Sequence, residues 1–163
     1  MSKVYISVGS NIDKETSIRK GINDMRQAFG ELQLSSVYQS QAVGFEGDDF
    51  YNLVVSFESS EPVLSISRQL HAIEDKNGRD RSGPRFSSRT LDLDLLLYDD
   101  LITEENGLEI PRGEILDNAF VLWPLAEIAP QRRHPITAKT YAEHWQAFDK
   151  TKEKLYPVEF DWA

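Results

Sequence analysis

A chain of 163 residues with 40% hydrophobic and 28% charged residues is long enough for one domain with a hydrophobic core, and this composition excludes a disordered protein. Its formal net charge of −9 argues against a general nucleic-acid or membrane-surface binder, because both partners are themselves anionic. We expect one monomeric domain over residues 1–163 that binds small molecules, with the packing of the tail from about residue 150 left open.

The sequence also indicates a compartment. The chain has no cysteine, which excludes disulfides and thiolate metal sites and is compatible with a reducing cytosol. Its first apolar run is too short for a signal peptide. The longest apolar stretch, residues 119–126, contains Pro124 and is far shorter than the roughly 20 residues that span a bilayer. We predict a cytoplasmic protein with no membrane partner.

In the first half of the chain, β-branched runs predict strands, and apolar residues at helical spacing predict a helix. Ile18, Ile22, Met25 and Phe29 recur on one helical face up to Gly30, a residue type that commonly ends helices. The expected elements are a strand at 4–8, a helix at about 14–29, a strand at 32–38, a loop at 40–49 and a strand at 50–57.

The second half continues the alternation of helices and strands. We expect a helix with its apolar stripe at 64–73, a basic loop at 76–89, a strand at 91–98, a return through 101–111, a helix at 120–128 interrupted by Pro124, and a helix at 141–148. The order βαββαβ predicts an α+β fold of the ferredoxin-like type, in which an antiparallel sheet carries both helices of the repeat on one face. The C-terminal helices are expected to cover the other face, which gives α-β-α layers.

The strand at 91–98 carries the first candidate site. Side chains alternate along a strand, so the leucines at odd positions from 91 to 97 are expected to line one face while Asp92 and Asp94 project from the other. Two carboxylates roughly 7 Å apart suit Mg²⁺, which completes its coordination with substrate phosphates and water. The alternative is that both aspartates simply solvate the outer face of the sheet.

The loop before this strand is strongly basic. Residues 76–89 contain five cationic side chains and one acid, a local charge of +4 in an acidic chain. Arginine matches phosphate geometry because its planar fork donates two parallel hydrogen bonds. A basic loop that leads into an acidic strand is typical of a polyphosphate held by arginines and bridged through Mg²⁺. A solvated basic loop that pairs with surrounding acids is the alternative.

Several short motifs, each weak alone, occur together in a specific order. They are Tyr5-Ile6-Ser7-Val8-Gly9-Ser10-Asn11, Tyr51-Asn52, Glu74 with Gly78-Arg79, Arg89-Thr90-Leu91-Asp92-Leu93-Asp94, and the stretch 120–130. In this combination the chain resembles hydroxymethyldihydropterin pyrophosphokinase of folate biosynthesis over about residues 3–130. That family transfers the β,γ-pyrophosphate of ATP to the hydroxymethyl group of a reduced pterin and releases AMP, on a ferredoxin-like fold.

The resemblance implies a role for each matching residue. Asp92 and Asp94 would hold two Mg²⁺ ions on the ATP phosphates, and Arg79 and Arg89 would neutralise charge on the transferred group. Positioning and electrostatic stabilisation supply most of the catalysis in phosphoryl transfer. The remaining ATP contacts would come from His71, Glu74, Arg81, Arg85 and Arg112. The reduced pterin would be bound by Asn52, stacked between Phe50 and Phe120, and lined by Ser40 and Val43. Without this resemblance, Phe50 and Phe120 would be interpreted as ordinary core aromatics.

The chain departs from the family pattern at three places. Ser87-Ser88 stands where the family has Gly-Pro, Arg112 where it has a histidine, and Asn118 where it has an arginine. Losing donors near a transferring phosphoryl group costs several kcal/mol of transition-state stabilisation. Three functions therefore stay open: a working Mg²⁺-dependent pterin pyrophosphokinase, a low-activity paralogue that binds pterin or ATP, and a related nucleotide-dependent transferase with another acceptor.

Overall fold

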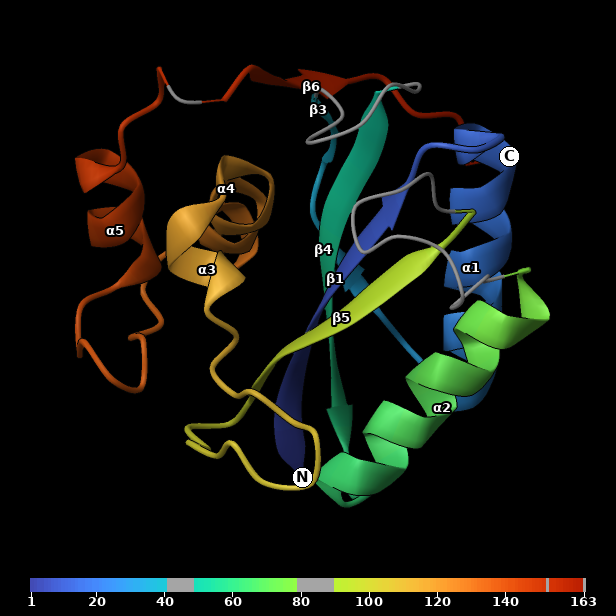
Figure 1. Cartoon of the computed structure of the whole chain (residues 1–163), viewed down its shortest axis with the longest axis horizontal. Helices are drawn as coiled ribbons and strands as arrows, with labels where there is room; N and C mark the ends of the chain where they lie inside the picture. Colours follow the sequence, from blue (N-terminus) through green and yellow to red (C-terminus); the bar gives the residue numbers. More distant parts are fainter. Residues whose placement is uncertain (41–48, 79–89, 152, 163) are drawn as a thin grey trace.

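The computed structural model describes residues 1–40, 49–78, 90–151 and 153–162. Figure 1 shows a central sheet with helices on both sides. In chain order the elements are β1 (Ser2–Ser10), α1 (Lys14–Phe29), β2 (Gln33–Leu34), β3 (Val37–Ser40), β4 (Phe50–Ser59), α2 (Val63–Lys76), β5 (Asp92–Tyr98), α3 (Glu114–Asp117), α4 (Ala119–Ile128), α5 (Tyr141–Ala147) and β6 (Leu155–Val158).

The sheet has the strand order β5-β1-β4-β3-β6, with β2 also paired to β4, and the pairs between its strands are antiparallel. β1 therefore lies between β4 and β5, as the βαββαβ unit requires. The predicted α+β ferredoxin-like fold is confirmed. β6 extends the sheet beyond β3, so the tail that the sequence left open packs against the domain.

Each face of the sheet carries its own hydrophobic cluster. Val4, Ile6 and Val8 of β1 pack with α1 and α2, whereas Tyr5 belongs to the cluster formed with α3, α4 and α5. Figure 1 shows α1 and α2 on one side and the other three helices opposite, so the predicted α-β-α layers are present. Among the described residues no helix is long and apolar enough to cross a bilayer.

One prediction about β5 is wrong. Leu91, Leu93 and Leu95 face α1 and α2 as expected, but Leu97 lies in the opposite cluster. The cause is a shift in the β1–β5 register: Tyr5 pairs with Leu97 and Ile6 with Leu95, which leaves Leu96 as an extra residue, as in a β-bulge. Because side chains alternate with a period of two, one inserted residue turns every later side chain to the other face.

Two further predictions are corrected. α4 runs through Pro124 without interruption, and Pro124 is buried there with its neighbours Leu122 and Leu125, so packing offsets the helical hydrogen bond that proline cannot make. The strand predicted at 32–38 is split into β2 and β3. Between them the amide of Ser35 donates to the Val54 carbonyl at 2.9 Å, and the Ser35 hydroxyl accepts from the Val54 amide at 2.9 Å.

Candidate functional site

The two aspartates of β5 lie on the sheet face that carries α3 and α4. Asp92 is the Cα partner of Gly9 on β1, and Asp94 is the partner of Ser7. Both side chains are partly exposed, while the leucines between and beside them are buried. The predicted separation of core leucines from paired carboxylates therefore holds for residues 91–95, before the register shift.

Asp94 lies in a crowded electrostatic environment. Burial, followed by repulsion from Asp92, raises the pKa of Asp94 to about 8, although the nearby Arg112 acts in the opposite direction. The Arg112 Nη2 lies 3.4 Å from the Asp94 Oδ1 and 3.1 Å from the Glu114 Oε1. Ionisation of Asp94 is therefore unfavourable in the metal-free protein, and a bound divalent cation would offset that cost.

Arg112 is placed beside Asp94 by the register shift in β5. The Arg112 amide donates to the carbonyl of Leu96, the extra residue of the shift, at 3.1 Å. Just before it, Thr103 and Ile110 exchange two backbone hydrogen bonds of 2.8 and 3.0 Å. The return segment is thereby held against β5 with Arg112 at its end. Glu114, the second partner of Arg112, was missed by sequence reasoning; its only signal is an acid two residues after that arginine.

The two predicted nucleotide contacts of α2 differ in their surroundings. Glu74 is buried at 3% exposure, and its Oε2 accepts a 2.8 Å hydrogen bond from the Leu93 amide, so it ties α2 to β5 between the two aspartates. His71, one turn earlier, is exposed. A role for either residue toward ATP stays a prediction.

The predicted pterin residues gather where β3 and β4 meet. Phe50 and Asn52 alternate onto the same face of β4, and Asn52 is buried while Phe50 is partly exposed. The Asn52 Nδ2 donates a 2.6 Å hydrogen bond to the Ser40 hydroxyl. Gly9 is the Cα partner of Asn52 across the β1–β4 pair, and a Cβ at Gly9 would lie 3.0 Å from the Asn52 Oδ1, so glycine permits this close approach.

Phe120 reaches the same face from α4. The helix is fixed on β3 by Tyr38, whose ring lies 4.8 Å from that of Trp123 and whose hydroxyl donates to the Glu127 Oε1 at 2.7 Å. Phe120 precedes Trp123 by about one turn, so the two point to the same side of α4. It packs against the cluster beneath α4 but stays partly exposed. Neither Phe50 nor Phe120 is enclosed as a core aromatic would be.

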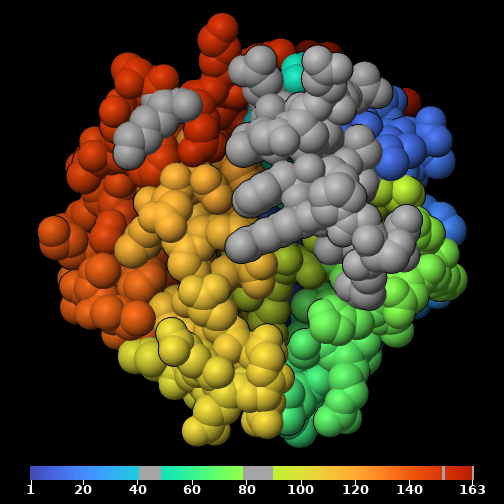
Figure 2. Space-filling view, in the orientation of Figure 1, coloured from blue at the N-terminus to red at the C-terminus, as the bar shows by residue number. Residues whose placement is uncertain are grey.

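Figure 2 shows a hollow between the α4 side, in gold, and α2, in green, with β5 at its base.

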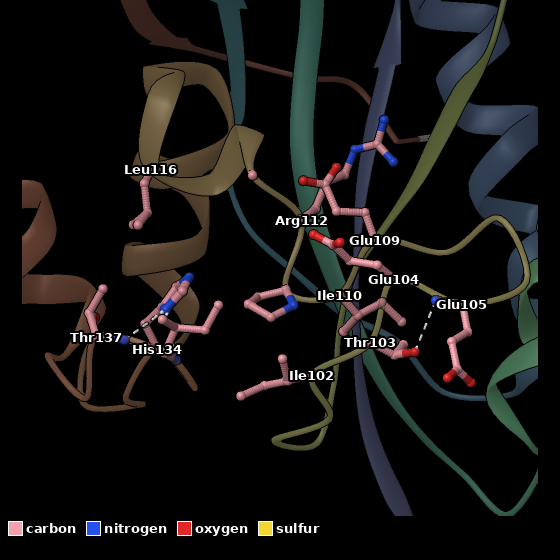
Figure 3. Close-up of a pocket in the computed structure, with 13 residues that line it drawn as sticks. Ile102, Thr103, Glu104, Glu105, Glu109, Ile110, Arg112, Leu116, His134 and Thr137 are labelled. Carbon is pink, nitrogen blue, oxygen red and sulfur yellow. Dashed lines mark hydrogen bonds between the residues drawn. The ribbon is translucent and has the colours of Figure 1, made fainter.

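A separate cavity of about 610 Å³, which the sequence did not predict, lies between the segment 102–113 and the loop 134–137. Figure 3 shows Arg112 at the end of this cavity opposite Ile102. The cavity is lined by Ile102, Thr103, Glu104, Glu105, Glu109, Ile110, Pro111, Arg112, Gly113, Leu116, His134, Ile136 and Thr137.

The other predicted contacts lie outside the described residues. This applies to Ser87 and Ser88, two of the departures from the family pattern, and to Val43, Arg79, Arg81, Arg85 and Arg89. Within the residues that the structure does describe, no three His, Asp or Glu side chains gather closely enough to hold a metal ion. The structure therefore brings together Asp92, Asp94 and Arg112 in one group, and Ser40, Phe50 and Asn52 in another. Phe120 lies on α4, which covers the same face of the sheet.

Sequence comparison gives a consistent family. The chain matches the family model described as 7,8-dihydro-6-hydroxymethylpterin-pyrophosphokinase (HPPK) over residues 5–130. It is 31% identical over 145 residues to the 2-amino-4-hydroxy-6-hydroxymethyldihydropteridine pyrophosphokinase of Aquifex aeolicus (strain VF5), covering 88% of this chain and 90% of that protein. The protein of the same name from Bacillus subtilis (strain 168) is 36% identical over 131 residues, covering 78% of each chain.

Solved structures share the fold. A crystal structure of HPPK-DHPS in complex with substrates matches 93% of this chain with a TM-score of 0.73 at 12% identity. Plasmodium falciparum HPPK-DHPS with pterin and p-hydroxybenzoate matches 89% with a TM-score of 0.70 at 14% identity. The present chain spans 44% and 42% of those two chains, and at these identities the likeness shows the fold alone.

The ferredoxin-like sheet and the matched relatives together define an α+β enzyme that transfers a phosphate-containing group. More closely, the chain belongs to the 7,8-dihydro-6-hydroxymethylpterin-pyrophosphokinase family. It is an ATP-dependent pyrophosphokinase of folate biosynthesis, which transfers pyrophosphate from ATP to the hydroxymethyl group of a reduced pterin.

Proposed function

We propose that this chain carries out its reaction in the hollow beside β5, with Mg²⁺ and ATP at Asp92 and Asp94 and the pterin at Asn52. The observation that carries this proposal is the position of β1 in the sheet. β1 pairs on one edge with β5, which carries Asp92 and Asp94, and on the other edge with β4, which carries Asn52. Neighbouring strands lie about 4.8 Å apart, so β5 and β4, the two strands that flank β1, lie about 10 Å from each other. The proposed phosphate and pterin sites would therefore be neighbours.

The aspartates have the donor chemistry that Mg²⁺ prefers. Carboxylate oxygens are hard ligands, and Mg²⁺ in nucleotide sites takes one or two of them together with phosphate oxygens and water. Asp92 and Asp94 would hold two such ions, whose bound charge would stabilise negative charge on the transferred group. Binding there would also offset the burial and the repulsion from Asp92 that raise the pKa of Asp94. Both residues fit the metal without a third protein ligand.

The pterin site combines one buried amide with two partly exposed rings. Asn52 donates to Ser40, which fixes the orientation of its amide and leaves the Oδ1 as an acceptor for the N–H edge of a heterocycle. Phe50 and Phe120 would stack on the two faces of the flat pterin, each adding about 1 kcal/mol beyond burial. Ser40 and Val43 would complete the lining.

In the proposed reaction, the hydroxymethyl oxygen of the pterin attacks the β-phosphorus of ATP. A bond forms between that oxygen and the β-phosphorus, the bond from the β-phosphorus to the bridging oxygen of the α-phosphate breaks, AMP leaves, and the hydroxyl proton passes to solvent. Arg112, held by Glu114, would contribute positive charge from the described part of the chain. Arg79 and Arg89 are proposed for the same task, with His71, Glu74, Arg81 and Arg85 as further ATP contacts.

The test is the release of AMP from ATP, Mg²⁺ and 6-hydroxymethyl-7,8-dihydropterin, followed in a coupled assay. We expect AMP and the pterin diphosphate in equal amounts, and no AMP when either Mg²⁺ or the pterin is left out. Tight pterin binding without AMP release would contradict the proposal and favour a binding protein. AMP release with another acceptor alone would favour a related transferase.

Phe120→Ala is expected to weaken pterin binding by about tenfold, because it removes one stacking ring and its buried area. ATP binding should stay within a factor of two. Phe148→Ala is the matched control, since Phe148 packs on the same cluster through α5 rather than at the β3–β4 junction. Isothermal titration with each ligand checks the result. Equal losses for pterin and ATP would show that Phe120 acts through the core instead.

We also propose a cytoplasmic monomer that takes only small-molecule substrates. A cytoplasmic location is favoured because the reaction consumes ATP, and the absence of cysteine agrees with a reducing compartment. Sedimentation of the purified chain at micromolar concentration would test the oligomeric state.

A further inference from the structure

The C-terminal tail contacts both sides of the proposed pterin site, although the family match ends at residue 130. On one side, the Glu153 Oε2 accepts a 2.9 Å hydrogen bond from the amide of Ala119, the first residue of α4. On the other side, Leu155 of β6 is the Cα partner of Ser40 on β3. Only one residue separates Glu153 from Leu155, so these contacts lie within roughly 7 Å of chain.

Glu153 caps the N-terminus of α4. The first amides of an α-helix have no partner within the helix and are usually capped by the side chain of the preceding residue. Asn118 occupies that position before α4, but its side chain makes no capping hydrogen bond. The carboxylate of Glu153 caps the helix from outside, and its negative charge suits the positive end of the helix dipole.

The capped amide lies next to Phe120, whose ring is proposed to stack on the pterin. Ala119 is buried at 2% exposure and directly precedes Phe120, so the cap fixes the backbone from which that ring projects. Further along the tail, the carbonyl of Asp161 accepts a 2.7 Å hydrogen bond from the Arg19 Nη1, and the Phe160 ring lies 6.1 Å from that of Tyr51. The tail is therefore anchored at both ends of its path.

From this geometry we propose that Glu153 is a positioning residue for the pterin. It holds Phe120 at a fixed distance from Ser40 and Asn52, and the tail thereby sets the width of the slot into which the flat ring enters. Glu153 itself does not touch the substrate. This inference rests on the proposed pterin site, and it assigns a function to a segment beyond the family match.

The experiment compares Glu153→Ala with Glu153→Gln, whose amide oxygen still accepts a hydrogen bond. Loss of a helix cap in Glu153→Ala is expected to raise the KM for the pterin about fivefold, with kcat and the KM for ATP unchanged. Glu153→Gln should recover most of the difference. Glu159→Ala, which removes an exposed acid from the same tail, is the control and should match the natural chain.

A double-mutant cycle separates positioning from general stability. If Glu153 acts through Phe120, Glu153→Ala should have little effect on pterin binding once Phe120→Ala is present. Additive losses, an unchanged KM for the pterin in Glu153→Ala, or equal rises in both KM values would each overturn the inference. A natural chain that binds no pterin in a direct titration would instead overturn the proposed function, so the two failures are distinguishable.

Discussion

Asp94→Asn should remove Mg²⁺-dependent turnover and yet raise the thermal stability of the metal-free protein. Loss of a carboxylate that is proposed to hold the cation is expected to lower kcat by at least about a hundredfold, the scale of removing one charge-stabilising group from such a site. Stability should rise because the Asp94 carboxylate is poorly solvated and is repelled by Asp92. Relief of about 1 kcal/mol would raise Tm by roughly 2–4 °C in a domain of this size.

The effect of Asp94→Asn on stability should depend on pH. The pKa of Asp94 is raised to about 8 in the folded protein from its ordinary value of 3.8, so between these values the folded state holds a proton that the unfolded state has lost. The free energy of unfolding therefore falls as pH rises from about 4 to about 8. The asparagine variant lacks this contribution, so its advantage over the natural chain should grow across that range.

Thermal unfolding in a chelator, repeated at pH 5 and pH 8, measures the effect. Asp100→Asn is the matched control, because Asp100 is an exposed aspartate in the turn that follows β5. It should change neither turnover nor the pH slope. A destabilised Asp94→Asn would mean that the ion pair with Arg112 outweighs the repulsion, and retained turnover would remove Asp94 from the metal site.

Local periodicity explains which parts of the fold and site were predictable. The side chains of Asp92 and Asp94, and those of Phe50 and Asn52, share a strand face because they are two residues apart, and that rule needs no knowledge of distant residues. The helix at 14–29 followed likewise from its apolar spacing and Gly30. Turn and helix signals then fixed the order βαββαβ, and the topology followed from it.

The parts that were not predictable depend on partners far along the chain. Leu97 changes face because the register of the β1–β5 pair shifts by one residue, and the pattern of leucines in the sequence does not indicate that shift. The same shift exposes the Leu96 carbonyl to the Arg112 amide, which brings Arg112 to Asp94. Glu153 lies 34 residues from the helix start that it caps. Such contacts arise from tertiary packing, which overrides local pattern.

Arg112→Ala should lower kcat/KM for ATP by about ten- to a hundredfold and leave pterin binding unchanged. Arg112 is 30% exposed in its side chain and lies between Asp94 and Glu114, so one carboxylate can orient its guanidinium while other N–H groups face a phosphate. Arginine also keeps its charge at every pH at which the enzyme works. Its loss removes a counter-charge from Asp94 and, in the proposed site, a donor to the transferred group.

Two further variants separate charge from orientation. Arg112→Lys keeps the positive charge but cannot donate in a planar fork, so an intermediate loss would show that both properties contribute. Glu114→Gln leaves Arg112 in place with one carboxylate partner, and a smaller loss of kcat/KM for ATP is expected because the guanidinium is less firmly held. Steady-state kinetics with ATP varied, beside titration with the pterin, measures each effect. If Arg112→Ala retains full kcat/KM for ATP, Arg112 serves only to neutralise Asp94, and the charge on the transferred group must be balanced from elsewhere.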